Sequence, residues 1–185
     1  MSEKMKRILL GITGASGAIY AKRLAEELQS KNCEVELLLS EAGEQVVKYE
    51  KQGALLKMGF VQHNNENYFA PPASGTSKYD AMVILPCSMG TMGRIATGAT
   101  DNLLTRAADV FLKEKRSLLI VPRESPHNRM QLENQLKLHD AGAIIVPASP
   151  FFYYHPETID DLVNTVVGKV LDQLKIDHTL FKPWG

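Results

Sequence analysis

The sequence has 185 residues, enough for one domain with a hydrophobic core and too few for two full domains, so residues 1–185 are expected to form a single domain. Lys and Arg together number 21, as do Asp and Glu, so no excess of charge indicates nucleic acid or an anionic membrane as a partner. The apolar stretches are too short to span a bilayer, no signal peptide is indicated, and two cysteines are too few for a disulfide framework. We expect a soluble cytoplasmic protein.

Short apolar segments alternate with amphipathic ones along the chain. The first helix, residues 17–31, has Ala18, Ala21, Ala25 and Leu28 on one face. Residues 62–78, rich in Asn, Pro, Ser and Gly, are expected to form a loop. The other segments predict strands at 7–12, 35–39, 81–85, 118–121 and 144–146, and helices at 41–51, 103–115, 126–141 and 159–174.

This alternation predicts parallel strands joined by right-handed crossovers. The expected fold is an α/β three-layer sandwich around a doubly wound, mainly parallel sheet. Such sheets bind ligands beyond the carboxyl ends of their strands. At these ends the sequence has GITGASG (11–17), Ser40, PCSMGT (86–91), PRESP (122–126) and PASP (147–150). Hydroxyl groups, glycines and one Arg-Glu pair are therefore expected along the carboxyl edge of the sheet, which we call the rim.

Two of these segments are candidate anion sites. GITGASG joins a strand to a helix, and its glycines and the N–H groups of the helix start are typical of a phosphate cradle. A tight turn that only packs the helix on the sheet is the alternative. In PRESP, Ser125 is the expected N-cap and Pro126 the first helical residue, so Arg123 and Glu124 would lie just before a helix. A solvated Arg-Glu ion pair is the alternative there.

PCSMGT is expected to be a loop with little acid–base chemistry of its own. Cys87 has no base nearby in the sequence and is expected to fill apolar space rather than act as a nucleophile. No HExxH or DDxxD motif and no cysteine cluster is present, so no metal site is expected. A loop of Ser, Gly and Thr is suited to holding a cofactor that carries the chemistry itself.

Five segments in order resemble the flavin prenyltransferases of the UbiX family. They are GITGASGA, Ser40, LPCSMGT followed by DNLLTRAADVFLKEKR, PRESP, and Phe152-Tyr153 before the final helix. The resemblance runs from about Lys6 to Trp184. It implies a flavodoxin-like domain that joins the dimethylallyl group of dimethylallyl monophosphate to N5 and C6 of reduced FMN. The products would be phosphate and prenylated FMN, the cofactor of UbiD-type decarboxylases. The resemblance further implies a dodecamer with sites between subunits and no metal requirement.

The resemblance also implies roles for particular residues. Ser16, Glu50 and Glu124 would be catalytic, with Glu50 transferring a proton near N5. The residues expected to hold FMN are Gly14, Ala15, Ser16, Ser40, Ser88, Met89, Gly90, Thr91 and Arg123. Those expected to contact the prenyl phosphate are Lys113, Arg123, Glu124, Tyr153, Lys169 and Trp184.

Each of three charged residues also has an ordinary structural explanation. Lys113 could interact with the partial negative charge at the end of its helix, Glu50 could be a solvated helix residue, and Lys169 could be surface charge on the last helix.

Two other functions remain open on the sequence. An FMN-dependent decarboxylase of cysteinyl substrates would have the same fold, but it needs a histidine on the helix after Ser40 and an asparagine in PCSMGT, and neither is present. A non-catalytic flavin carrier subunit would not need the cations Lys113, Arg123 and Lys169.

Overall fold

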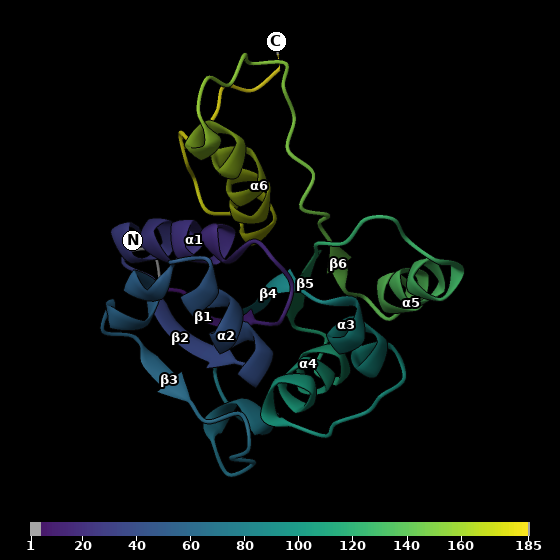
Figure 1. Cartoon of the computed structure of the whole chain (residues 1–185). Coiled ribbons are helices and arrows are strands. Elements are labelled where there is room, and N and C mark those ends of the chain that lie inside the picture. Colours follow the sequence, from purple (N-terminus) through teal and green to yellow (C-terminus); the bar gives the residue numbers. More distant parts are fainter. Residues whose placement is uncertain (1–4, 185) are drawn as a thin grey trace.

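The computed structural model describes residues 5–184, and a six-stranded parallel sheet runs through its centre (Figure 1). Its strands are short and mostly apolar, as expected when helices cover both faces. In chain order they are β1 (Arg7–Ile12), β2 (Glu34–Leu39), β3 (Val61–His63), β4 (Ala81–Cys87), β5 (Ser117–Pro122) and β6 (Ile144–Ile145).

Among the described residues, six α-helices and two short 3-10 helices accompany the strands, and the last, α6, follows β6. The α-helices are α1 (Ala18–Ser30), α2 (Glu41–Tyr49), α3 (Met89–Ala96), α4 (Leu103–Lys113), α5 (Arg129–Asp140) and α6 (Ile159–Leu174). The 3-10 helices are η1 (Gly53–Lys57) and η2 (Pro71–Ala73). No helix among the described residues is long and apolar enough to cross a membrane.

The strand order is β3-β2-β1-β4-β5-β6. The chain therefore moves outward from β1 to β3, returns to the other side of β1, and moves outward again to β6. This reversal makes the carboxyl ends of β1 and β4 the point where such sheets form a ligand crevice. The predicted doubly wound three-layer sandwich is confirmed.

Two apolar layers enclose the sheet. One lies under α1 and α6, where Leu24, Leu28 and Val167 are fully buried. The other lies under α3 and α4, where Met92 and Phe111 are fully buried. Figure 1 shows α1 and α6 on one side of the sheet and α4 on the other.

The sheet also buries one charged cluster. Glu36 on β2 is 3% exposed and accepts hydrogen bonds from Arg7, His63 and Tyr79. Burial alone would raise the pKa of Glu36, but the bonds from Tyr79, His63 and Arg7 outweigh it and hold this pKa below its ordinary value. The cluster is fully paired, so we interpret it as a structural tie between β1, β2 and β3.

Three predictions about the elements were wrong. Residues 62–78 were expected to be a loop, but Val61–His63 form an edge strand and Pro71–Ala73 a helical turn. PCSMGT was expected to be a loop, but β4 continues to Cys87 and α3 begins at Met89. The helix expected from Pro126 begins only at Arg129, because Asn128 is its N-cap and forms a capping box with Gln131.

Candidate functional site

Three helices begin at the carboxyl ends of the neighbouring strands β2, β1 and β4. The hydroxyl of Ser40 accepts a hydrogen bond from Gly43 N at 3.0 Å and so caps α2. The hydroxyl of Ser88 accepts from Thr91 N at 3.3 Å and caps α3. Gly17 precedes α1. Each helix start carries partial positive charge and backbone N–H groups without a partner inside the helix, so this rim is suited to an anion.

The turn between β1 and α1 forms the middle of the rim. Gly14 is packed so closely against α2 that a Cβ there would lie 2.6 Å from the Cβ of Ala42. Ala15 is 6% exposed, so only its backbone can face a ligand, whereas Ser16 is exposed. The carbonyl oxygen of Ser16 accepts a hydrogen bond from Arg123 Nε at 3.0 Å. The predicted neighbours Ser16 and Arg123 therefore do lie together.

Thr13, to which the sequence analysis assigned no role, joins this turn to PCSMGT. It is fully buried. Its hydroxyl donates to the carbonyl of Pro86 at 2.9 Å and accepts from Ser88 N at 2.7 Å. Thr13 N also donates to Pro86 O, at 3.2 Å. A threonine between a strand end and a glycine turn was the available signal, but only the fold shows that its partners Pro86 and Ser88 lie 73 and 75 residues away in the sequence.

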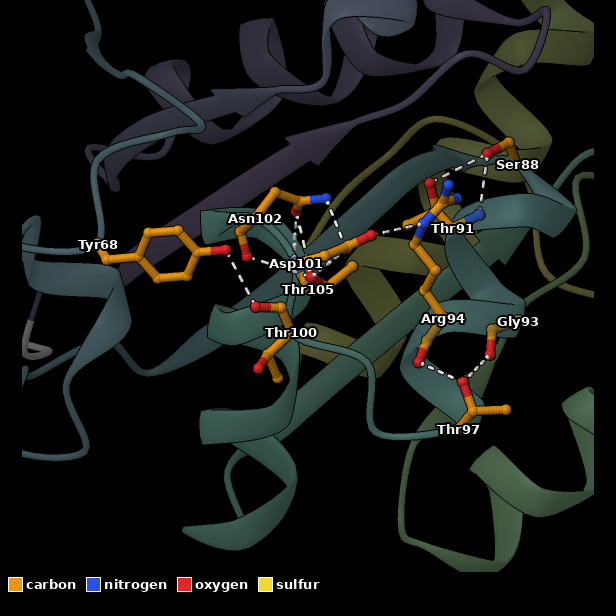
Figure 2. Close-up of polar contacts among 10 residues, drawn as sticks. All are labelled: Tyr68, Ser88, Thr91, Gly93, Arg94, Thr97, Thr100, Asp101, Asn102 and Thr105. Carbon is orange, nitrogen blue, oxygen red and sulfur yellow. Dashed lines mark hydrogen bonds and ion pairs between the residues drawn. The ribbon is translucent and has the colours of Figure 1, made fainter.

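PCSMGT presents the start of α3 rather than an open loop (Figure 2). Ser88 and Thr91 are half-buried, and their hydroxyls are 3.1 Å apart. Met89 is 8% exposed and packs into the core, so it offers a ligand only its backbone. At Gly90 a Cβ would meet only Arg94 Nη1 at 3.6 Å, so this turn is open. Burial raises the pKa of Cys87 to about 12, as expected for a cysteine that fills apolar space.

Polar contacts, also drawn in Figure 2, hold the connection between α3 and α4 in place. Arg94 Nε lies 3.1 Å from Asp101 Oδ2, and the side chain of Asn102 caps α4 by accepting from Thr105 N at 3.0 Å. The hydroxyl of Tyr68 donates to Thr100 O at 3.0 Å. Part of segment 62–78 thus supports the connection from α3 to α4.

Glu50 lies at the end of α2, and its carboxylate faces the start of α1. Its oxygens accept from Gly17 N at 3.1 Å and Ala18 N at 2.8 Å. Glu50 is therefore not a merely solvated helix residue. It occupies the first N–H groups of the turn that the sequence analysis considered as a phosphate cradle, which leaves Gly14 to Ser16 and the starts of α2 and α3 for a ligand.

Arg123 and Glu124 extend from the end of β5, but no helix starts directly behind them. Ser125 is not an N-cap: its N–H donates to Glu124 Oε1 at 3.0 Å. The expected helix dipole at PRESP was therefore wrong. Both residues instead line an open cavity of about 540 Å³ together with Pro147 to Pro150 and Phe152.

Tyr153, Lys169 and Trp184 line a second cavity of about 560 Å³, formed by the C-terminal end of α6 and the segment that follows it. The rings of Tyr153 and Trp184 meet edge to face, with centroids 5.1 Å apart. Lys169 Nζ lies 2.9 Å from Asp172 Oδ2. Three predicted residues from the C-terminal part of the chain are thus brought together, next to Asp172 and His178, for which no role was predicted.

Lys113 is not near either cavity within one chain. Helix α4 runs back toward the amino ends of the strands, so its last residue lies beside the start of β5 at Ser117. There Lys113 pairs with Glu114, next to Gly75. The predicted phosphate contacts therefore occupy three separate places: Arg123 and Glu124 at the rim, Tyr153, Lys169 and Trp184 in the second cavity, and Lys113 at the opposite edge.

The donors at the rim fit FMN. A flavin nucleotide needs hydrogen-bond donors for its phosphate and small polar groups along its flat ring. The rim offers the starts of α2 and α3, the hydroxyls of Ser16, Ser88 and Thr91, and the guanidinium of Arg123, with open space at Gly90.

Comparison with known proteins agrees with this chemistry. The model of the Flavoprotein family matches residues 1–171. A flavin prenyltransferase UbiX of Methanocaldococcus jannaschii is 47% identical over 182 residues, which cover 97% of this chain and 98% of the relative.

Two solved structures superpose on nearly the whole chain. AnUbiX (PadA1), in complex with FMN and dimethylallyl pyrophosphate, has a TM-score of 0.92 and 36% identity, covering 98% of each chain. A dodecameric FMN-dependent UbiX-like decarboxylase from Escherichia coli O157:H7 has a TM-score of 0.90 and 39% identity, covering 97% of this chain and 99% of that one. In sequence and in fold, this chain belongs to the UbiX family of flavin prenyltransferases.

Proposed function

We propose that this protein transfers the dimethylallyl group of dimethylallyl monophosphate to N5 and C6 of reduced FMN, releasing phosphate and prenylated FMN. The observation that carries the proposal is the rim, where the starts of α2 and α3, Ser16 and Arg123 converge at the crevice between β1 and β4. Family membership supports the same reaction.

We assign FMN to this rim. Gly14, Ala15 and Met89 would contribute backbone groups, because two of them are buried and one has no side chain. The remaining contacts would come from side-chain hydroxyls, the open turn and the guanidinium, namely Ser16, Ser40, Ser88, Gly90, Thr91 and Arg123. When bound, reduced FMN supplies the nucleophilic ring atoms.

Glu50 is assigned to proton transfer near N5. Its carboxylate is held at a fixed point beside the turn by Gly17 N and Ala18 N. Ser16 is assigned to polarising the flavin edge or the phosphate ester, and Glu124 to the phosphate. A positioned carboxylate of this kind typically contributes a factor of about 10²–10⁴ to a proton transfer.

An allylic phosphate ionises when cations stabilise the leaving oxygens and aromatic surfaces stabilise the allylic cation. We assign the first role to Lys113, Arg123 and Lys169, and the second to Tyr153 and Trp184. Because these groups lie in three places in one chain, we propose that neighbouring copies complete each site. A dodecamer, as in the similar UbiX-like structure, would provide such neighbours.

We further propose that the chain is one FMN-binding domain, residues 1–185, of which residues 1–4 and 185 lie outside the described part. We propose a cytoplasmic location and a UbiD-type decarboxylase as the recipient of prenylated FMN.

The test is an anaerobic incubation of the purified protein with reduced FMN and dimethylallyl monophosphate in the presence of a metal chelator. The flavin is then extracted and weighed by mass spectrometry. We expect a flavin heavier by one prenyl unit and an equal amount of inorganic phosphate. A parallel reaction with the pyrophosphate identifies the preferred donor. Unmodified FMN in both reactions would contradict the proposal, and carbon dioxide release from a cysteinyl peptide would establish the decarboxylase alternative.

A further inference from the structure

The segment after α6 folds back onto that helix at Gly168. A Cβ at Gly168 would lie 2.3 Å from Phe181 Cε1 and 2.8 Å from His178 Cε1, so only glycine allows this approach. The ring of His178 meets that of Phe181 at 5.0 Å, and Phe181 in turn meets Phe151 at 5.0 Å. The contact at Gly168 therefore fixes where His178 lies relative to α6.

Both ring nitrogens of His178 are engaged. Nδ1 accepts a hydrogen bond from Leu180 N at 3.2 Å, so the ring proton of the neutral imidazole lies on Nε2. Nε2 then donates to Asp172 Oδ1 at 3.1 Å. The His178 side chain is only 6% exposed. It has no free nitrogen to offer a substrate, which makes it a positioning residue and not a proton donor.

Asp172 links this histidine to a cation. Its Oδ1 is bound by His178, and its Oδ2 lies 2.9 Å from Lys169 Nζ. A lysine side chain is long and flexible, and an exposed ion pair alone holds it weakly. With one carboxylate oxygen fixed by a buried histidine, the other presents a fixed partner to the ammonium at the wall of the cavity.

We propose that His178 and Asp172 are positioning residues for Lys169 and hold its ammonium where the phosphate of the prenyl donor binds. The inference rests on the proposed function, because it takes the cavity of Tyr153, Lys169 and Trp184 as the donor site. It adds a chain of contacts, from Gly168 through His178 and Asp172 to Lys169, that orders the cation before the donor arrives.

Two substitutions of His178 separate hydrogen bonding from packing. His178→Phe keeps an aromatic ring against Phe181 but removes the bond to Asp172. His178→Gln can keep a side-chain N–H near the position of Nε2 but loses the ring. We expect His178→Phe to raise KM for dimethylallyl monophosphate by about five- to tenfold, the size of one typical intramolecular hydrogen bond, with little change in kcat.

His178→Gln should restore most of this loss. If packing alone mattered, the order would reverse, with His178→Phe close to wild type and His178→Gln impaired, and the inference would be overturned. His139→Phe, on the exposed side of α5, is the matched control and should leave KM unchanged.

A double-mutant cycle tests whether His178 acts through Lys169. Once Lys169→Met has removed the ammonium, His178→Phe should raise KM no further, because the two residues act as one unit. Additive effects of the two substitutions would contradict the proposal. FMN absorbance and Tm, measured on every variant, show whether it is still folded. If His178→Phe has lost its fold, the test is the KM of His178→Gln compared with the wild type.

Binding can be followed without the reaction. Trp184 is the only tryptophan in the sequence and lies in this cavity. Titration of the FMN-bound protein with inorganic phosphate or the intact donor should change its fluorescence, with weaker binding in His178→Phe and recovery in His178→Gln. No response in the wild type would overturn the inference even if prenylated flavin is formed. A normal response without prenylated flavin would reject the proposed function and keep the inference.

Discussion

The rim and the C-terminal cavity are built in different ways. At the rim, the decisive contacts involve the backbone: Thr13 binds Pro86 O and Ser88 N, Ser40 binds Gly43 N, and Arg123 binds Ser16 O. In the cavity, the contacts join side chains, as in Lys169 with Asp172 and Tyr153 with Trp184.

This difference follows from the position of each region in the fold. The rim segments follow the carboxyl ends of buried strands, so the geometry of the rim is set when the sheet forms. The cavity depends on a segment near the end of the chain that packs back on α6. Substitutions in residues 13–17 and 88–91 of the rim should therefore change flavin binding or the chemistry on it, and substitutions in the cavity should change use of the prenyl donor. Arg123 and Glu124, at the rim, are assigned to the prenyl phosphate and should affect the donor as well.

The largest effect is expected at Glu50. Glu50→Gln keeps an acceptor for Gly17 N and Ala18 N but removes the basic carboxylate, so FMN should stay bound while turnover falls by about 10²- to 10⁴-fold. Single-turnover kinetics with bound reduced FMN measure this directly. An unchanged rate would remove Glu50 from the mechanism.

Thr13→Val should weaken FMN binding. Valine has nearly the same shape but leaves Ser88 N without its buried partner, and such a loss costs about 1–3 kcal/mol, or about five- to 150-fold if it acts on the bound flavin. Fluorescence titration of FMN gives the affinity. Thr13→Ser retains the hydroxyl and should bind close to wild type; if both variants bind FMN normally, Thr13 does not organise the rim.

Gly168→Ala should have the smallest effect. In contrast to Thr13→Val, it should change use of the prenyl donor and not the binding of FMN. The added methyl group displaces His178 and Phe181, so KM for the donor should rise by about three- to tenfold, with about 1–3 kcal/mol of stability lost to overpacking. The affinity for FMN should not change. Gly53→Ala is the control, because no atom lies within 4 Å of a Cβ there. A loss of FMN binding in Gly168→Ala would show that the two regions are not separate.

Most of the fold could be predicted from the sequence because most helices and strands have a recognisable local pattern. Segments such as 7–12 and 81–85 are apolar and short, and the final helix has Thr158 as its cap, which forms a capping box with Asp161. The helix at 126–141 was misplaced because Ser-Pro fits a helix start as well as Asn128 does. Strand β3 was missed because Val61 to His63 form an exposed edge strand with little apolar pattern.

The candidate site was predictable only where its residues lie in recognisable segments. Ser40, Ser88 and Arg123 come directly after strands and Ser16 lies in the turn that follows β1, so the parallel sheet predicts that they converge. The bonds of Thr13 to Ser88, and of His178 through Asp172 to Lys169, depend on contacts that only the folded chain creates. No local pattern distinguishes these residues from ordinary polar ones.

Hydrogen exchange, read peptide by peptide by mass spectrometry, tests the two-region account most directly. FMN should slow exchange at the amides of residues 13–17 and 88–91. Dimethylallyl monophosphate, added to the FMN-bound protein, should slow exchange in residues 123–124, 151–154 and 168–184 and add little protection at residues 88–91. Protection of residues 168–184 by FMN alone, or of residues 13–17 only by the donor, would contradict the assignment of flavin to the rim and donor to the C-terminal cavity.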